Sequence, residues 1–152
     1  LDRAETSSAT RPPDTGTSAW SFPRTRHALF AQAVARHVGD HAWAVAATAE
    51  ADDCWRRGAP FVAATFARIR VGSAIAHVER GAMDMAAREL ETVLPMSPQL
   101  RVATWTGYVC ELLDSLHDRG LAEITAGRDL VARCREFDSV ALRPASSPNR
   151  PP

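Results

Sequence analysis

Two histidines, His37 and His41, come closest among the residues of this chain to the spacing of a metal site. They stand four residues apart, which would place both imidazoles on one face of a continuous helix. Gly39 lies between them and predicts that the helix ends there. We therefore interpret the two histidines as turn residues, and we expect neither a metal nor a cofactor.

Two further groups of residues could act in catalysis: a set of Ser, His and Asp residues, and a pair of neighbouring carboxylates. Ser115, His117 and Asp118 fall on one predicted helix, too close together to form a triad, whose members come from separate segments. Asp52 and Asp53 are spaced to pair with arginines four residues later, on a solvated helix face. The sequence has no nucleophile-elbow, zinc-protease, dinucleotide-binding or P-loop motif. We therefore expect a protein that is not an enzyme and has no catalytic residues.

The composition describes the domain that would have to position any site. The chain has 152 residues, 45% of them hydrophobic, and its 18 basic residues balance 18 acidic ones. This length is that of one domain with its own core. All the basic residues are Arg, whose guanidinium can bind a carboxylate in a bidentate manner. Charge neutrality argues against direct nucleic-acid binding, and the lack of an apolar run of about 20 residues argues against a membrane span. We expect a cytoplasmic protein with no membrane contact.

The apolar periodicity predicts an all-α fold. Ala-rich stretches with apolar residues at three- and four-residue spacing are separated by Gly or Pro, and none alternates with the period of a strand. Six helices are predicted, over residues 23–38, 41–57, 61–80, 82–94, 98–118 and 121–137. Asp40 is placed to cap the second, and Ser97 with Pro98 to begin the fifth. The expected apolar face of the first helix consists of Leu29, Phe30, Ala33, Val34 and His37.

The two ends differ in composition from the helical middle. Residues 6–18 have Ala9 as their single apolar residue, and residues 139–152 contain four prolines and three serines. Neither stretch can bury enough apolar surface to offset the entropy of ordering. We expect disorder or the end of a preceding helix at 1–18, a helical repeat domain at 19–138 and a disordered tail at 139–152. Because the chain opens on Leu1 in the middle of a pattern, we expect it to be a fragment of a longer protein.

Glycines recur at the end of every second predicted helix. Gly39, Gly81 and Gly120 each follow one helix and precede another, at intervals of 42 and 39 residues. Small or apolar residues stand five and twelve positions after each glycine. Such a period is typical of helical hairpins, in which small residues let two antiparallel helices approach closely.

The middle copy, residues 70–98, carries small residues at Ala74 and Ala86 and closes on Pro98. In these features it resembles a tetratricopeptide repeat. It departs from that family at His77, where an aromatic residue is usual, and its period exceeds the family's 34 residues. The resemblance implies a short solenoid of stacked antiparallel hairpins, whose first helices line a concave surface.

Three segments carry a second resemblance, which spans nearly the whole chain. They are Trp20–Pro23, Leu90–Pro95 and Pro98–Val102, and they accompany Arg- and Ala-rich hairpins that end near Phe137. The pattern resembles the C-terminal helical region of helix-turn-helix transcriptional regulators from high-GC bacteria. In that family, tetratricopeptide-like repeats follow a DNA-binding domain and respond to a protein, a peptide or a small effector. Nothing in the chain matches the DNA-binding domain itself, so the resemblance implies the sensor region alone.

The resemblance also implies where a ligand would bind. The helices at 23–38, 61–80 and 98–118 would form the groove, and Arg101, Trp105 and Tyr108 share one helix face by their spacing. The contacts expected for an acidic group or a C-terminal carboxylate are Arg26, Phe30, Arg68, Arg101 and Trp105. The alternative is that Trp105 belongs to the core and the arginines face solvent.

Two other functions remain open from the sequence. One is a helical-bundle enzyme that uses His77 or His117 as a base; His77 replaces the expected aromatic residue in the small-residue seam. The other is a structural dimerisation module, in which the last repeat buries its apolar face against a second copy to form a homodimer.

The three cysteines are Cys54, Cys110 and Cys134. Their odd number and wide spacing fit neither a disulfide framework nor a zinc ribbon. All three fall on apolar-periodic positions, so we predict three small buried residues in a reducing compartment.

Overall fold

The computed structural model of the chain describes residues 22–96 and 103–141, with side chains for 22–96 and 107–136. Within these ranges the protein is all-α and contains no strand. The helices are α2 (Arg24–His37), α3 (His41–Arg56), α4 (Ala63–Glu79), α5 (Met83–Glu91), α6 (Ala103–Asp118), the short 3-10 helix η2 (Leu121–Glu123) and α7 (Thr125–Ala141). The segment 1–18, residues 142–152 and the predicted helix start at Ser97 and Pro98 lie outside the described residues. Because α7 runs to Ala141, the helical domain continues past the predicted boundary at residue 138.

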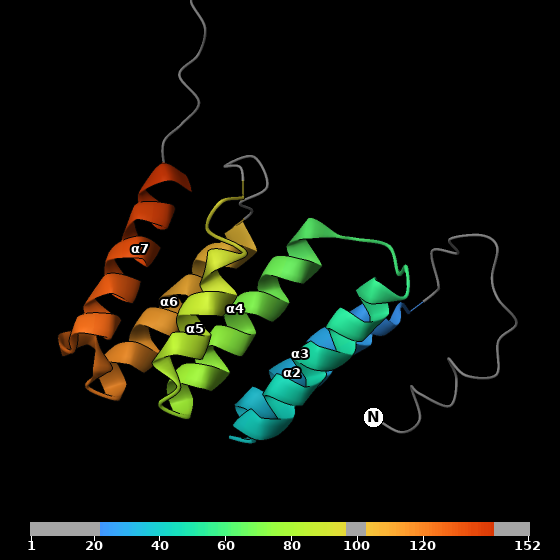
Figure 1. Cartoon of the computed structure of the whole chain (residues 1–152), viewed down its shortest axis with the longest axis horizontal. Coiled ribbons are helices and arrows are strands. Elements are labelled where there is room, and N and C mark those ends of the chain that lie inside the picture. Colours follow the sequence, from blue (N-terminus) through green and yellow to red (C-terminus); the bar gives the residue numbers. More distant parts are fainter. Residues whose placement is uncertain (1–21, 97–102, 142–152) are drawn as a thin grey trace, which may run out of the picture.

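The helices pair into antiparallel hairpins that stand side by side in a row (Figure 1). The pairs are α2 with α3, α4 with α5, and α6 with α7. Helix α4 packs against α2 and α3 on one side and against α5 and α6 on the other, so it is the central element of the row. This arrangement confirms the predicted all-α stack of hairpins.

Glycines with left-handed backbone end the helices at corresponding places. Gly39 (φ 77°) follows α2 and Gly81 (φ 74°) follows α4. At both, the amide of the next residue donates to a carbonyl of the last helical turn, from Asp40 to Ala35 and from Ala82 to His77. A left-handed glycine with this bond is the Schellman motif, which satisfies carbonyls that the helix leaves unpaired. Asp40 then accepts a hydrogen bond from the Trp43 amide (2.9 Å), which confirms its predicted role as the cap of α3.

Three predicted helix boundaries are wrong by three or four residues, and one of them is the end of the sixth helix, which lies at Ala141 instead of residue 137. The fourth helix ends at Glu91 instead of residue 94, where the Thr92 hydroxyl donates to the Glu89 carbonyl (2.7 Å) and Pro95 has no amide to extend the helix. The sixth begins at Thr125 instead of residue 121, because Leu121–Glu123 form a separate 3-10 turn. That turn packs on the bare Cα of Gly127, where a side chain would overlap the Leu121 carbonyl.

The core is unevenly distributed along the row. The second and third hairpins share one large cluster, which includes Leu90, Leu112 and Leu130. The first hairpin instead meets α4 through two small clusters built mainly from alanines, one around Ile69 and one around Ala76. Alanines let the helices of this hairpin approach α4 closely, and Leu29, Ile69 and the partly buried Trp43 and Trp55 supply the larger apolar side chains of the contact.

The predicted apolar face of α2 is wrong. The side of α2 that packs into the protein carries Thr25, Ala28, Leu29, Ala31, Gln32 and Ala35. Of the expected residues, Leu29 alone is buried; Phe30, Val34 and His37 are exposed, and Ala33 is half-buried. Three alanines, Thr25, Leu29 and Gln32 therefore make the contact, in place of the larger Phe30 and Val34.

Two of the three cysteines are buried as predicted. Cys54 and Cys134 lie in the interior, whereas Cys110 is exposed on α6. The prediction is wrong for Cys110 because its neighbours Val109 and Leu112 carry the buried face of α6.

Candidate functional site

Tyr108 of α6 lies at the centre of a polar cluster that joins the first helices of all three hairpins. The guanidinium carbons of Arg36 on α2 and Arg68 on α4 lie over its ring, 5.3 and 5.2 Å from the ring centroid. Arg68 also donates a hydrogen bond to the phenol oxygen (3.3 Å). Glu111, one turn further along α6, forms an ion pair with Arg36. The tyrosine cluster, defined as Arg36, Arg68, Tyr108 and Glu111, therefore brings together α2, α4 and α6.

The two arginines of the tyrosine cluster differ in their electrostatic surroundings. Only 7% of the Arg36 side chain is exposed, and Glu111 compensates its charge. Burial lowers the pKa of the Arg36 guanidinium, and Tyr108 acts in the opposite direction.

Arg68 has no carboxylate partner among the described side chains. It is half-buried, its contacts are the ring and hydroxyl of Tyr108, and its Nε is buried without a hydrogen-bond partner. A guanidinium held by an aromatic ring in this way keeps its capacity to bind an anionic oxygen. Arg68 is thus the cation of the cluster that an acidic ligand could neutralise.

The structure places the five predicted ligand contacts in different situations. Arg68 lies in the tyrosine cluster. Arg26 and Phe30 are exposed on α2, where Phe30 stacks on Phe22 (centroids 5.8 Å apart), and neither belongs to that cluster. Arg101 lies outside the described residues, and Trp105 lies in α6 with its side chain outside them. The described part of the predicted groove is therefore centred on Arg68.

Sequence reasoning missed Arg36 and Glu111 as parts of this site. Arg36 was hidden because the face of α2 was assigned incorrectly. Glu111 follows Tyr108 by three residues, a spacing that puts both on one face of α6, so periodicity alone could have grouped them.

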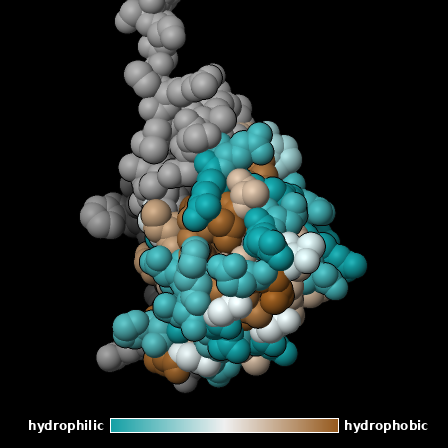
Figure 2. Space-filling view, turned by 90° about the vertical axis from the view of Figure 1, so that its left-hand side faces the viewer, coloured by the Kyte–Doolittle hydropathy of each residue, from teal (hydrophilic) through white to brown (hydrophobic). Residues whose placement is uncertain are grey.

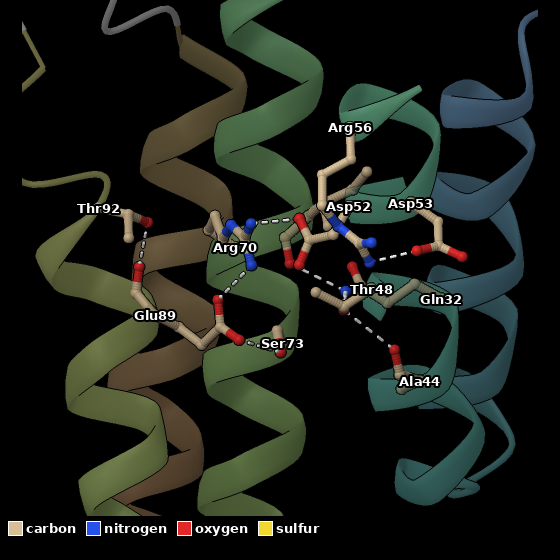
Figure 3. A network of polar contacts seen from close by, with 11 residues as sticks. Gln32, Ala44, Thr48, Asp52, Asp53, Arg56, Arg70, Ser73, Glu89 and Thr92 are labelled. Atoms are coloured by element: carbon tan, nitrogen blue, oxygen red, sulfur yellow. Dashed lines mark hydrogen bonds and ion pairs between the residues drawn. The ribbon is translucent and has the colours of Figure 1, made fainter. Parts of the chain in front are cut away.

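A second polar network fastens the first two hairpins together (Figure 3). Arg70 on α4 pairs with Asp52 on α3 and with Glu89 on α5, the latter at 3.0 Å. Ser73 donates a further hydrogen bond to Glu89 (3.1 Å). Only 15% of the Arg70 side chain is exposed. The role of these groups is structural, because each charge finds its partner within the chain.

This network corrects one sequence interpretation. Asp52 and Asp53 were both expected on a solvated face with Arg56 and Arg57. Asp53 does pair with both arginines there, but Asp52 turns inward to Arg70. The pattern of charges along α3 could not show a partner supplied by another helix.

Three aromatic rings line an open recess of about 320 Å³ beside this network. Trp55, Phe61 and Phe66 pack against one another, with ring centroids 5.3 to 6.3 Å apart. The charged residues at the recess are Asp52, Arg56 and Arg70, and all three form ion pairs within the chain. Unlike Arg68, they offer no uncompensated charge to a ligand.

The two histidines considered as bases lie in different surroundings. His77 is buried on α4, and burial lowers the pKa of its imidazole below 6.5, with Glu89 opposing the shift and Arg80 adding to it. His117 is exposed on α6, its Nδ1 lies 2.7 Å from the Leu113 carbonyl oxygen, and it lines a recess of about 340 Å³ with Glu123 and Arg128. The described side chains include no group of three or more His, Cys, Asp or Glu residues that could hold a metal ion.

Comparison with known proteins adds no relative. No protein-family model matches the chain, and neither a curated protein nor a solved structure is detectably similar to it. In the part of the chain that the structure describes, no helix is both long enough and apolar enough to cross a bilayer.

Proposed function

We propose that the chain is a non-enzymatic binding module that recognises an acidic group of a protein, a peptide or a small effector at Arg68 and Tyr108. The observation that carries the proposal is the contrast between two arginines over one ring. Arg36 is neutralised by Glu111, whereas Arg68 has no carboxylate partner among the described residues. A carboxylate at Arg68 would form a charge-assisted hydrogen bond beside an aromatic surface.

The hairpin architecture supports a binding role of this kind. Stacked helical hairpins create extended surfaces from side chains on successive repeats. The tyrosine cluster draws its residues from the first helix of each hairpin, the helices that line the ligand groove in tetratricopeptide arrays. Together with the resemblance of the sequence, this supports a cytoplasmic tetratricopeptide-like sensor region of a helix-turn-helix transcriptional regulator, whose DNA-binding domain would be a separate part of the parent protein.

Calorimetric titration with short acidic peptides tests the proposal. The probes are peptides that carry a free C-terminal carboxylate and Asp or Glu side chains, each compared with an amidated, Asn- or Gln-substituted counterpart. We expect the acidic peptides to bind and the neutral ones to bind at least about tenfold more weakly, since a hydrogen bond to a charged group contributes about 1.5–3 kcal/mol.

Variants of the chain locate the site. Arg68→Gln should weaken binding about tenfold or more, whereas Arg26→Gln removes an exposed arginine outside the tyrosine cluster and should leave affinity unchanged. Arg101→Ala tests the predicted contact outside the described residues. Equal binding by wild type and Arg68→Gln would refute the proposed site.

A further inference from the structure

The outer surface of the α2–α3 hairpin is apolar at the end of the row of described helices. Phe30, Val34 and Val38 follow one another at four-residue spacing along α2 and into its C-terminal turn, with 50, 45 and 64% of their surface exposed. On α3, Ala42 and Ala46 are exposed at the same spacing, and Glu50 continues their line. We call these six residues the end face.

The two stripes of the end face lie next to each other on the side away from α4. Glu50 reaches Arg24 on α2 (4.0 Å), which places its stripe beside α2. By contrast, Thr48 and Asp52 of α3 contact Gln32 and Arg70, on the side where α4 packs. The end face is therefore the surface on which another hairpin of the row would pack.

Large and small residues stand level with each other across the end face. Ala28 and Ala51 share one cluster, and Ala35 and Ala44 share another, which fixes the register of the antiparallel pair. In that register Val38 lies level with Ala42, and Val34 with Ala46. One helix thus presents large apolar side chains, and the other presents small ones at the same heights.

The opposite end of the row has a different character. Figure 2 views that end, formed by α7, and hydrophilic side chains cover most of it, around smaller apolar areas. Over the described side chains of α7, residues 125–136, no large apolar residue is exposed, while Arg128, Asp129, Arg135 and Glu136 are. A terminal repeat needs such a polar outer face to stay solvated alone. The described part of the α7 end is therefore more polar than the end face, with Ile124, 46% exposed directly before α7, as its one large exposed apolar residue.

We infer that the end face binds the end face of a second copy of this chain, about a twofold axis parallel to the helices. This operation sets α2 of one copy on α3 of the other, antiparallel and at equal heights. Each Val34 then meets Ala46 of the second copy, and each Val38 meets Ala42, so large side chains fill the space above small ones. A twofold interface requires such self-complementarity.

The charges at the edge of the end face, Glu50 and its neighbour Arg24, match the same arrangement. Arg24 and Glu50 stand close together within one copy and are 55 and 35% exposed at the side chain. Across the axis, each Arg24 approaches Glu50 of the second copy, so two ion pairs become one group of four alternating charges. A head-to-tail contact with α7 would place the apolar stripes against a charged surface, which disfavours an open-ended polymer.

Sedimentation velocity over a range of concentrations tests the dimer, with a reductant present because Cys110 is exposed. Wild type should shift from 16.5 kDa toward twice that mass. Val34→Arg and Ala46→Glu should each weaken self-association at least about tenfold, because each places a charge opposite an apolar residue. An equimolar mixture of the two variants should recover association, since the arginine introduced in one chain then faces the glutamate introduced in the other.

Met85→Arg is the matched control, because Met85 is 41% exposed on α5, away from the end face. It should associate as wild type does, and circular dichroism should show native helicity in every variant. Three results would overturn the inference: a wild type that stays monomeric at the highest concentration, dimers that tolerate both single variants, or a mixture that stays monomeric. The first would also be the outcome if another segment of the chain covered the end face.

Discussion

The side-chain amide of Gln32 on α2 lies against the bare Cα of Gly72 on α4. Gln32 is 1% exposed and donates hydrogen bonds to the Thr48 hydroxyl (2.7 Å) and to the Ile69 carbonyl (2.9 Å). A Cβ at position 72 would overlap the Gln32 carboxamide. The absence of a side chain at Gly72 of α4 therefore allows the Gln32 side chain of α2 to connect α2, α3 and α4.

Gly72→Ala should destabilise the protein by about 1–3 kcal/mol, because it forces Gln32 out of its hydrogen bonds or moves α2 away from α4. Gly107→Ala is the control: outside its own stretch of helix backbone, no described atom lies within 4 Å of a Cβ added at this exposed position of α6. That change should stabilise the helix by up to about 1 kcal/mol. Urea unfolding followed by circular dichroism measures both, and changes of the same sign would contradict the explanation.

Arg70→Met should cost about 2–4 kcal/mol, since it leaves Asp52 and Glu89 partly buried without their counterion. Arg56→Met removes an arginine whose ion pair with Asp53 is exposed, and it should cost less than about 1 kcal/mol. Thermal and urea unfolding of the two variants give the comparison. A loss at Arg70 no larger than that at Arg56 would show that the network in Figure 3 contributes little to stability.

The stability of the protein should fall on acidification through His77. Burial lowers the pKa of this imidazole in the folded state below its ordinary value of 6.5. As the pH drops through 6.5, the unfolded chain therefore takes up a proton that the folded protein does not, and the free energy of unfolding decreases until the folded-state pKa is reached. His77→Gln should flatten the dependence of the melting temperature on pH between about 7 and 5. An unchanged slope in this variant would exclude His77 as its source.

The three cysteines should react at very different rates. Burial raises the pKa of the Cys134 thiol to about 11, so that it is protonated near neutral pH, and Cys54 is buried too. Iodoacetamide at pH about 8 should therefore modify one thiol per folded chain, Cys110, and all three after unfolding. Mass spectrometry counts the labels, and Cys110→Ser should abolish labelling of the folded protein. Rapid modification of Cys134 in the native state would contradict its burial.

The fold could be predicted from the sequence because its signals are local. The glycines at 39, 81 and 120 end helices through a backbone conformation that other residues rarely adopt, and Asp40 caps the next helix with its own side chain. These features depend on a few neighbouring residues. They fixed the order and pairing of the helices even where individual boundaries were wrong.

The site could be predicted only in part, because its contacts join helices distant in sequence. Arg68 was found from its residue type and its place on the third predicted helix. Its position beside Tyr108, and the pairing of Arg36 with Glu111 across 75 residues, depend on how the hairpins stack. On α2, Phe30 and Val34 follow the periodicity of a core face, but hydrophobicity alone does not show whether a core or a second molecule covers that face.

The contact between the first hairpin and α4 consists mainly of alanines. The first hairpin should therefore separate from the protein at a lower free-energy cost than the second and third hairpins separate from each other. Separating α2 and α3 from α4 exposes mainly alanine side chains to water. It therefore exposes less apolar surface than separating the helices that share the large leucine-rich cluster. Amide protons of α2 and α3 should consequently exchange with solvent through partial openings that leave α4, α5, α6 and α7 intact.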